Sequence, residues 1–177
     1  MQHNKHLILF TLLKALGLYV LWFILYDLWL NPMGTLDRWA INSISITASI
    51  VLKAMGYTLI PEPPPEEIIR TIGIDGTHGL WIGDPCNGLT IMALFAGFIL
   101  ILPGKWKQKI MYVALGIFVL HVANILRVVG LCLVLKHYPN SLEFNHTYSF
   151  TMVVYSIVFG LWLYWINTYS TLTLNTK

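Results

Sequence analysis

Apolar residues along the chain gather into four long runs that are separated by short polar segments. The runs cover residues 7–30, 86–102, 110–135 and 147–166. Each run approaches or exceeds the roughly 20 residues that an α-helix needs to cross a bilayer, so the pattern predicts four membrane-spanning helices. Residues 31–34 and 136–145 are expected to separate helices as a turn and a polar loop. The first run is too long for a removable signal peptide and lacks a small-residue cleavage site, so we expect it to remain as an anchor.

Residues 40–59 place apolar and polar side chains on opposite sides of a helix. The apolar positions are Ile41, Ile44, Ala48, Val51, Met55 and Leu59, and the polar positions are Asn42, Ser45, Ser49 and Lys53. An amphipathic helix of this kind lies on a membrane surface or covers other helices. We expect this segment to lie on the membrane, although its length also permits crossing.

A polar connector and a short hairpin precede the second apolar run. Residues 61–67 are rich in proline and glutamate, which predicts a stiff, solvated connector. The stretches 68–74 and 80–82 flank the turn sequence Asp75-Gly76. This arrangement predicts a β-hairpin that delivers the chain to Cys86.

The composition changes this picture by excluding a soluble protein. Hydrophobic residues make up 56% of the chain and charged residues 11%, and the mean hydropathy is +0.67. No basic stripe is interleaved with stacking aromatic residues, so we expect no nucleic-acid partner. The length of 177 residues allows one domain, residues 1–177. We therefore expect an all-α, polytopic transmembrane helical bundle in a lipid bilayer, with one extra amphipathic helix and a short extracytoplasmic hairpin.

The distribution of charge predicts the orientation in the membrane. Lys105, Lys107 and Lys109 crowd one short loop, which the positive-inside rule places in the cytoplasm. Lys5 and Lys14 independently favour a cytoplasmic N-terminus. Both observations agree if residues 40–59 do not cross, which leaves both termini in the cytoplasm and all eight acidic residues at or beyond the outer interface. These acidic residues are Asp27, Asp37, Glu62, Glu66, Glu67, Asp75, Asp84 and Glu143.

Cys86 is the first candidate for chemistry. Asp84 is a good N-cap and Pro85 a good first helical residue, so we expect a helix to begin here with Cys86 in its first turn. Unpaired N–H groups and the helix dipole favour a thiolate at that position. The alternative is a small buried cysteine that only packs. Because Cys86 and Cys132 lack CxxC spacing, we expect free thiols and neither a disulfide nor a zinc site.

Arg127 is the second candidate, because a charged side chain inside an apolar span is costly and is usually kept for a function or a partner. It lies 17 residues from Ile110, and Cys86 lies 16 residues from Leu102. At 1.5 Å per residue, both residues are roughly 25 Å above the inner side of the membrane, and thus at the same level. The alternative is an arginine that extends to the interface or pairs with a backbone carbonyl.

Histidines supply the candidate base. His146 lies at the start of the last run, at the same outer edge as Cys86 and Arg127. A thiol nucleophile, an imidazole base and a fixed cation for an oxyanion are the parts that acyl transfer needs. His78 in the predicted hairpin is the alternative base, whereas His121 is expected to form a hydrogen bond inside the bundle. No pair of histidines has zinc-ligand spacing with a third ligand, so we expect neither a metal nor another cofactor.

Three short segments resemble the signature segments of the exosortase/archaeosortase family. They are Asp84-Pro85-Cys86-Asn87-Gly88-Leu89, Asn124-Ile125-Leu126-Arg127-Val128 and Phe144-Asn145-His146. They occur in the family's order, and the resemblance spans about residues 80–160. Family members are polytopic membrane enzymes thought to act as transpeptidases on exported proteins with a C-terminal sorting tail.

The resemblance implies a role for each matched residue. It makes Cys86 the nucleophile, Arg127 the transition-state cation and His146 the third catalytic residue. Supporting positions are Asn87, Gly88, Asn124 and His78. Archaeal relatives carry an arginine at the position of His146, so the resemblance is to the bacterial branch. The chain resembles the compact, single-domain members of the family, so we expect no fused soluble domain.

Together these observations predict a membrane cysteine transpeptidase or protease of the bacterial cytoplasmic (inner) membrane, with its active site facing outward. Its substrates are expected to be membrane-anchored exported proteins, cleaved at a C-terminal sorting signal through an acyl-enzyme on Cys86. The product is then transferred to an acceptor amine, glycan or lipid, or to water. Two alternatives stay open: a non-catalytic scaffold in which Arg127 pairs with a partner's acid, and a thiol-dependent lipid acyltransferase.

Overall fold

The structure is a computed structural model that describes residues 13–61 and 71–169. The described chain is almost entirely helical, and its one sheet is a two-stranded ladder. The predicted all-α fold is therefore confirmed. Among the described residues, three helical segments are long and apolar enough to cross a membrane: Leu13–Met33, Trp106–His137 and Pro139–Thr168.

The first segment, Leu13–Met33, includes the π-helix η1 (Phe23–Leu30) and the short helix α2 (Asn31–Met33). It confirms the first predicted span over the described residues. The break falls within the predicted residues 31–34, although the chain stays helical through Pro32 and Met33. The helix ends at Gly34, which has a φ of 65° and redirects the chain.

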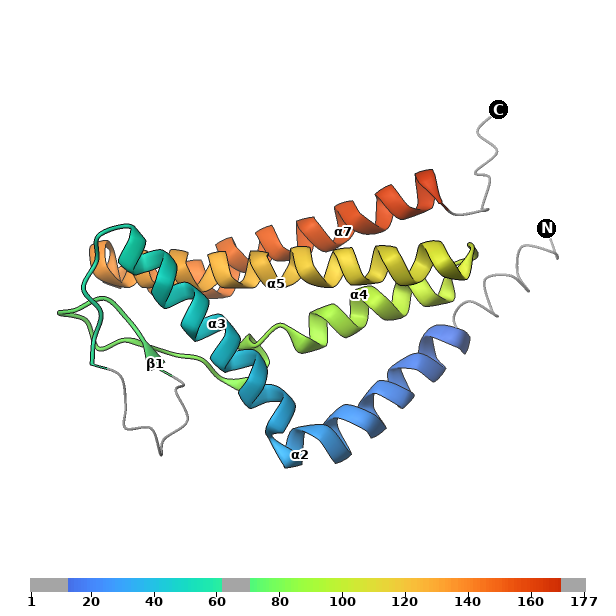
Figure 1. Cartoon of the computed structure of the whole chain (residues 1–177), viewed down its shortest axis with the longest axis horizontal. Helices are drawn as coiled ribbons and strands as arrows, with labels where there is room; N and C mark the ends of the chain where they lie inside the picture. Colours follow the sequence, from blue (N-terminus) through green and yellow to red (C-terminus); the bar gives the residue numbers. More distant parts are fainter. Residues whose placement is uncertain (1–12, 62–70, 170–177) are drawn as a thin grey trace.

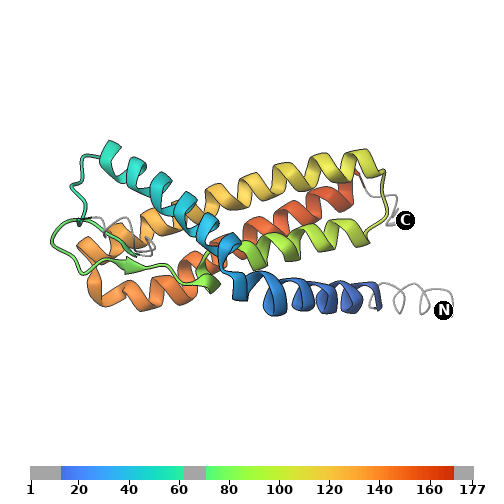
Figure 2. The same cartoon turned by 60° about the horizontal axis from the view of Figure 1, so that its bottom comes forward.

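Three helices run side by side as the central bundle: α4 (Leu89–Ile101), α5 (Trp106–His137) and α7 (Phe150–Thr168) (Figures 1 and 2). Their shared core includes the fully buried side chains of Phe95, Leu120 and Trp165. The Tyr112 hydroxyl donates to the carbonyl of Leu161 on α7 at 2.7 Å.

The second predicted span is shorter than expected. Helix α4 covers 13 residues, because Gly88 with φ 82° precedes it and Leu102-Pro103 ends it. At 1.5 Å per residue, α4 is about 20 Å long, which is less than the roughly 30 Å of bilayer hydrocarbon. The prediction that residues 86–102 form a full membrane span is therefore wrong.

The predicted polar loop at 136–145 is also wrong in its structure. Helix α5 continues through His137 and the chain reverses at Tyr138, whose φ and ψ of −140° and 59° are not helical. The 3₁₀-helix η3 (Pro139–Ser141), the short helix α6 (Leu142–Phe144) and the π-helix η4 (Asn145–Ser149) then lead directly into α7. A proline costs no hydrogen bond in the first turn of a helix, so Pro139 starts this segment instead of breaking it.

Helix α3 (Thr35–Ala54) crosses the bundle obliquely and packs against α5 (Figure 1). Of the predicted apolar face, Ile41, Ile44 and Ala48 are inaccessible to solvent, whereas Met55, just beyond the end of the helix, is exposed. The helix ends before the predicted residue 59, because Gly56 has a φ of 89°. Ser45 was expected on the polar, exposed side but is buried. Helix α3 is not among the helices that are long and apolar enough to span a membrane.

The predicted hairpin is present. Strand β1 (Thr71–Ile72) pairs antiparallel with β2 (Leu80–Trp81), and Ile72 is opposite Leu80. An isolated bridge joins Leu59 to Ile74. Lys136 at the end of α5 donates to the carbonyl of Asp75 at 2.7 Å, which fixes the turn against the bundle. Almost all of the predicted connector at residues 61–67 lies outside the described residues.

The two ends of the bundle differ in what they carry. The start of the first described helix, the α4–α5 loop and the end of α7 lie at one end, and the hairpin lies at the other (Figures 1 and 2). This arrangement agrees with a basic loop on the same side as both terminal helix ends. Which side faces the cytoplasm stays a prediction.

Candidate active site

Cys86, Arg127 and His146 line one small cavity of about 30 Å³. The Cys86 Sγ lies 3.6 Å from the Nε2 of His146, although the two residues are 60 positions apart in the sequence. The remaining lining residues are apolar or aromatic and come from the hairpin and from α5. They are Leu80, Trp81, Ile82, Val128 and Leu131.

Cys86 is carried by a tight turn between the hairpin and α4. Residues Asp84–Cys86 form the 3₁₀-helix η2, with Pro85 in its first turn and Gly83 as the N-cap. The N–H of Cys86 donates to the carbonyl of Gly83 at 2.9 Å. The prediction that Asp84 caps the apolar helix is therefore wrong: the helix begins three residues after Cys86, and the Cys86 N–H is already bonded within the turn.

Arg127 projects from α5 between two hollows. One is the small cavity with Cys86, and the other is an apolar groove of about 320 Å³ between α5 and α7. Residues that line the groove include Val119, Val122, Ala123, Phe150 and Val153. The Arg127 Nε is buried and has no hydrogen-bond partner within the described part of the chain. The guanidinium thus lies at the cavity, and its Nε forms no hydrogen bond with the described residues.

His146 belongs to the π-helix η4, which leads into α7. The hydroxyl of Thr151 donates to the His146 carbonyl at 3.0 Å, five residues back, which satisfies a carbonyl that the wider turn leaves free. Single π-helical turns inside α-helices occur frequently at functional sites. The Nε2 of the ring faces the thiol and can accept its proton when that nitrogen is unprotonated.

Two of the predicted supporting residues fix the backbone around Cys86. The Asn124 Nδ2, one turn before Arg127 on α5, donates to the Cys86 carbonyl at 3.1 Å. Gly88 adopts a φ of 82°, and a Cβ there would lie 3.1 Å from the same Nδ2 atom. Only glycine combines this conformation with this close approach without strain.

Comparison with known proteins identifies the family of the chain. The family model for transmembrane exosortases matches residues 7–166 of the 177-residue chain. The chain belongs to the transmembrane exosortase family. Neither a curated protein nor a solved structure matches it. With its apolar helices, the exosortase is an integral membrane protein of a family of sorting transpeptidases.

The other histidines in the described part of the chain do not line the cavity. His78 is exposed in the hairpin, its Nδ1 lies 2.8 Å from the Gly79 carbonyl, and it does not line the cavity. It therefore does not reach Cys86 in this structure. The Nε2 of His121 lies 3.0 Å from the Ser43 hydroxyl, so the predicted hydrogen bond inside the bundle is confirmed.

Asp37 is the site residue that sequence reasoning missed. It was grouped with the other acidic residues at or beyond the outer interface and given no role at the site, but its side chain is 1% exposed and contacts Asn87. The Asn87 Nδ2 donates to the Asp37 Oδ1 at 2.6 Å. A signal was available, because Asp37 falls at helical spacing on the same face of α3 as the buried Ile41 and Ile44.

Both cysteines are free, as predicted. Cys132 is completely buried in the core between α3, α5 and the hairpin, and its thiol lies 3.9 Å from the Ile72 carbonyl. It does not line the cavity of Cys86. Among the described residues, no group of three His, Cys, Asp or Glu side chains could hold a metal ion.

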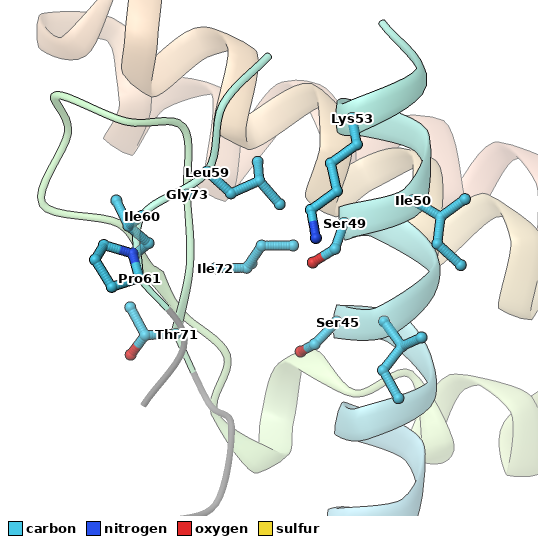
Figure 3. Close-up of a pocket in the computed structure, with 11 residues that line it drawn as sticks. Ser45, Ser49, Ile50, Lys53, Leu59, Ile60, Pro61, Thr71, Ile72 and Gly73 are labelled. Carbon is cyan, nitrogen blue, oxygen red and sulfur yellow. The ribbon is translucent and has the colours of Figure 1, made fainter. Parts of the chain in front are cut away.

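A third hollow lies beside strand β1, whereas its partner strand β2 lines the Cys86 cavity. This groove of about 140 Å³ separates α3 from the hairpin, and Ser45, Ser49 and Lys53 point into it from α3 (Figure 3). Its opposite wall includes Ile72, which pairs with Leu80 of the Cys86 cavity. The polar stripe predicted to face solvent thus faces this groove.

Proposed function

We propose that this exosortase is a cysteine-dependent membrane transpeptidase that cleaves the C-terminal sorting signal of exported, membrane-anchored proteins. The observation that carries the proposal is the 3.6 Å approach of the Cys86 Sγ to the His146 Nε2 in a cavity that Arg127 also lines. A nucleophile, a base within reach and a fixed cation are the minimum set for acyl transfer through a covalent intermediate.

In the first half-reaction, His146 accepts the Cys86 proton and the sulfur attacks the scissile peptide carbonyl. Arg127 stabilises the oxyanion that forms, because a guanidinium keeps its charge and presents several donors. The tetrahedral intermediate collapses to a thioester on Cys86. His146 gives its proton to the departing amine of the tail.

In the second half-reaction, an acceptor amine or hydroxyl, on a glycan or lipid, attacks the thioester. His146 takes the proton of the acceptor, and the Cys86 thiol is regenerated when the C–S bond breaks. Water in place of the acceptor gives hydrolysis. An anchored substrate diffuses in two dimensions at a fixed depth. A site just before a short helix such as α4 therefore meets the scissile bond of the substrate in a defined orientation.

The proposal includes the cellular location. The exosortase is placed in a bacterial cytoplasmic membrane, with the Lys105–Lys109 loop and both termini in the cytoplasm. The hairpin and the Cys86 cavity then lie toward the outer side, where exported substrates arrive. Single cysteines introduced at Lys107 and at Asp75 test this orientation through their accessibility to a membrane-impermeant thiol reagent.

Substitution of the three cavity residues tests the mechanism. Cys86→Ala is expected to abolish tail processing, and Arg127→Ala and His146→Ala to lower it by about 10²–10³-fold and 10²–10⁴-fold. Processing is followed in membranes that contain the full-length exosortase and an exported protein with its tail. Cys132→Ala is the matched control, because it removes the other thiol outside the cavity. Normal processing by inserted Cys86→Ala protein would falsify the assignment.

The Arg127 Nε has no hydrogen-bond partner in the described ranges, which also supports a second function, a scaffold in which Arg127 pairs with an acid of a partner protein. Thiol labelling separates the two. Cys86 of an enzyme reacts rapidly near neutral pH, whereas a packing cysteine reacts slowly. Mass spectrometry of trapped Cys86 completes the test: a peptidyl adduct supports the transpeptidase, and a fatty acyl adduct indicates a lipid acyltransferase instead.

A further inference from the structure

A buried carboxylate joins three parts of the chain next to Cys86. Asp37 is the third residue of α3, and its Oδ1 accepts a hydrogen bond from the Tyr26 hydroxyl at 2.5 Å and from the Asn87 Nδ2 at 2.6 Å. Tyr26 belongs to the first helical segment, and Asn87 follows Cys86 directly in the chain. Tyr26, Asp37 and Asn87 are all nearly inaccessible to solvent.

The local structure explains how this carboxylate is tolerated inside the protein. Its Oδ1 accepts from two donors, whereas its Oδ2 is buried without a hydrogen-bond partner among the described residues. Asp37 also lies in the first turn of α3, where the positive end of the helix dipole favours an anion. A buried acid held in this way is expensive to keep, so it points to a purpose beyond packing.

Asn87 transmits this anchor to the backbone. While its Nδ2 donates to Asp37, its Oδ1 accepts the N–H of Leu89 at 2.9 Å, at the start of α4. On the other side of Cys86, Asn124 donates to the Cys86 carbonyl. Residues 86–88 are therefore held from α3 through Asp37 and from α5 through Asn124.

We propose that Asp37 is a positioning residue, which acts through Asn87 to hold the Cys86 Sγ in line with the His146 Nε2. This inference rests on the proposed function where it is tested by tail processing. Its second test, alkylation of the Cys86 thiol, does not depend on that function. Without the Asp37 carboxylate, the Asn87 amide loses its anchor and the turn that carries the nucleophile is fixed from one side only. Displacements of about 1 Å at a nucleophile cost as much as about 10²-fold in rate.

The test compares Asp37→Ala with Asp37→Asn in full-length exosortase in membranes. Asparagine keeps a carbonyl oxygen at the same place that accepts from both donors, so it is expected to process tails within about threefold of wild type. Alanine removes the acceptor, and processing is expected to fall by about 10- to 100-fold. Asp27→Ala, which removes an exposed acid one residue from Tyr26, is the matched control and is expected to match wild type.

A double-mutant cycle shows whether Asp37 acts through Asn87. Residues that act through one contact give strongly non-additive effects. Asn87→Ala is therefore expected to reproduce the loss seen with Asp37→Ala, and the double variant to be no worse than either single one. Additive losses, or a wild-type rate in Asp37→Ala, overturn the proposal.

The second readout is the time profile of Cys86 alkylation near neutral pH in a Cys132→Ala background, where Cys86 is the remaining thiol. Wild type is expected to be alkylated rapidly, because the His146 Nε2 lies 3.6 Å from the thiol, and the profile of Asp37→Ala is expected to shift to slower alkylation. Unchanged profiles in Asp37→Ala overturn the positioning role. A shifted profile without tail processing by wild type supports positioning and contradicts the proposed function.

Asp37→Ser keeps the test decisive if Asp37→Ala fails to accumulate. Its hydroxyl fills part of the space but is one bond too short to reach the Asn87 amide, so the same loss and the same shifted profile are expected. If neither Asp37→Ala nor Asp37→Ser is found in the membrane while Asp37→Asn is present in normal amounts, the role of Asp37 is purely structural and the proposal is overturned.

Discussion

Replacing Gly88 by alanine tests how tightly the turn that carries Cys86 must be built. Gly88 has a φ of 82°, in the left-handed region that side chains other than glycine rarely adopt. A Cβ at this position would lie 3.1 Å from the Asn124 Nδ2 and 3.4 Å from the Met92 Cε. The first of these atoms is the donor to the Cys86 carbonyl, so the new methyl group acts directly on a bond that fixes the nucleophile.

The structure sets the size of the expected effect. An L-residue in the left-handed region costs about 1–2 kcal/mol. Moving the Asn124 amide by a few tenths of an ångström weakens a hydrogen bond that contributes about 1 kcal/mol. Together this is about 2–3 kcal/mol, which corresponds to roughly 30- to 160-fold in rate if all of it is lost from the transition state.

The assay measures tail processing by Gly88→Ala in membranes, beside the amount of inserted protein. Gly160→Ala in α7 is the control, because a Cβ there meets no atom within 4 Å and glycine inside a helix is slightly destabilising. Gly160→Ala is expected to keep the wild-type rate and to be at least as stable as wild type. The reasoning is refuted if inserted Gly88→Ala processes tails as fast as Gly160→Ala does.

Two further substitutions test the packing and the assignment of the base. In Gly116→Ala, the new Cβ would lie 2.2 Å from ring atoms of the fully buried Phe95, so α4 and α5 must shift. Overpacking of this kind costs about 1–3 kcal/mol, and thermal unfolding in detergent should begin several degrees below that of the Gly160→Ala control; equal stability contradicts the close packing. His78→Ala is expected to leave processing unchanged, because the side chain is exposed and outside the cavity, and a tenfold loss would make His78 the base.

The meeting of Cys86 with Arg127 could be predicted from the sequence because helical rise is regular. Counting residues along two neighbouring helices gave the same level for both side chains, and both line one cavity in the structure. His146 could be placed beside them because the last apolar run begins there. These predictions depend on length and hydrophobicity, which are properties of a segment and not of its neighbours.

The local structure around Cys86 was harder to predict. Asp84 and Pro85 are typical of the start of an α-helix, but they fit the first turn of a 3₁₀-helix equally well. The deciding residue is Gly88, whose positive φ separates that turn from α4, and a glycine at this position is compatible with either structure. Local propensity therefore predicts that a helix begins at Asp84, but not whether it is a 3₁₀-helix or an α-helix.

Burial of polar residues depends on partners that are distant in the sequence. Asp37 is buried because Tyr26 and Asn87, 11 and 50 residues away, both donate to it. Ser45 is covered because residues after the connector fold back as the hairpin. Neither contact follows from the periodicity of α3, which predicts an inner face but not the element that covers the outer one.

The unequal lengths of α4 and α5 have a consequence for the surrounding lipid. Packed side by side, α4 is about 20 Å long and α5 about 48 Å, so no flat slab of hydrocarbon about 30 Å thick matches both. We therefore expect lipid next to α4 to thin, at a modest free-energy cost for each ångström of mismatch. Cys86 lies three residues before α4, at its hairpin end, so we expect a local depression of the membrane surface there. The thickness of the host bilayer then becomes a variable of the reaction, because it sets how far a substrate's anchor must sink before its peptide bond is level with the sulfur.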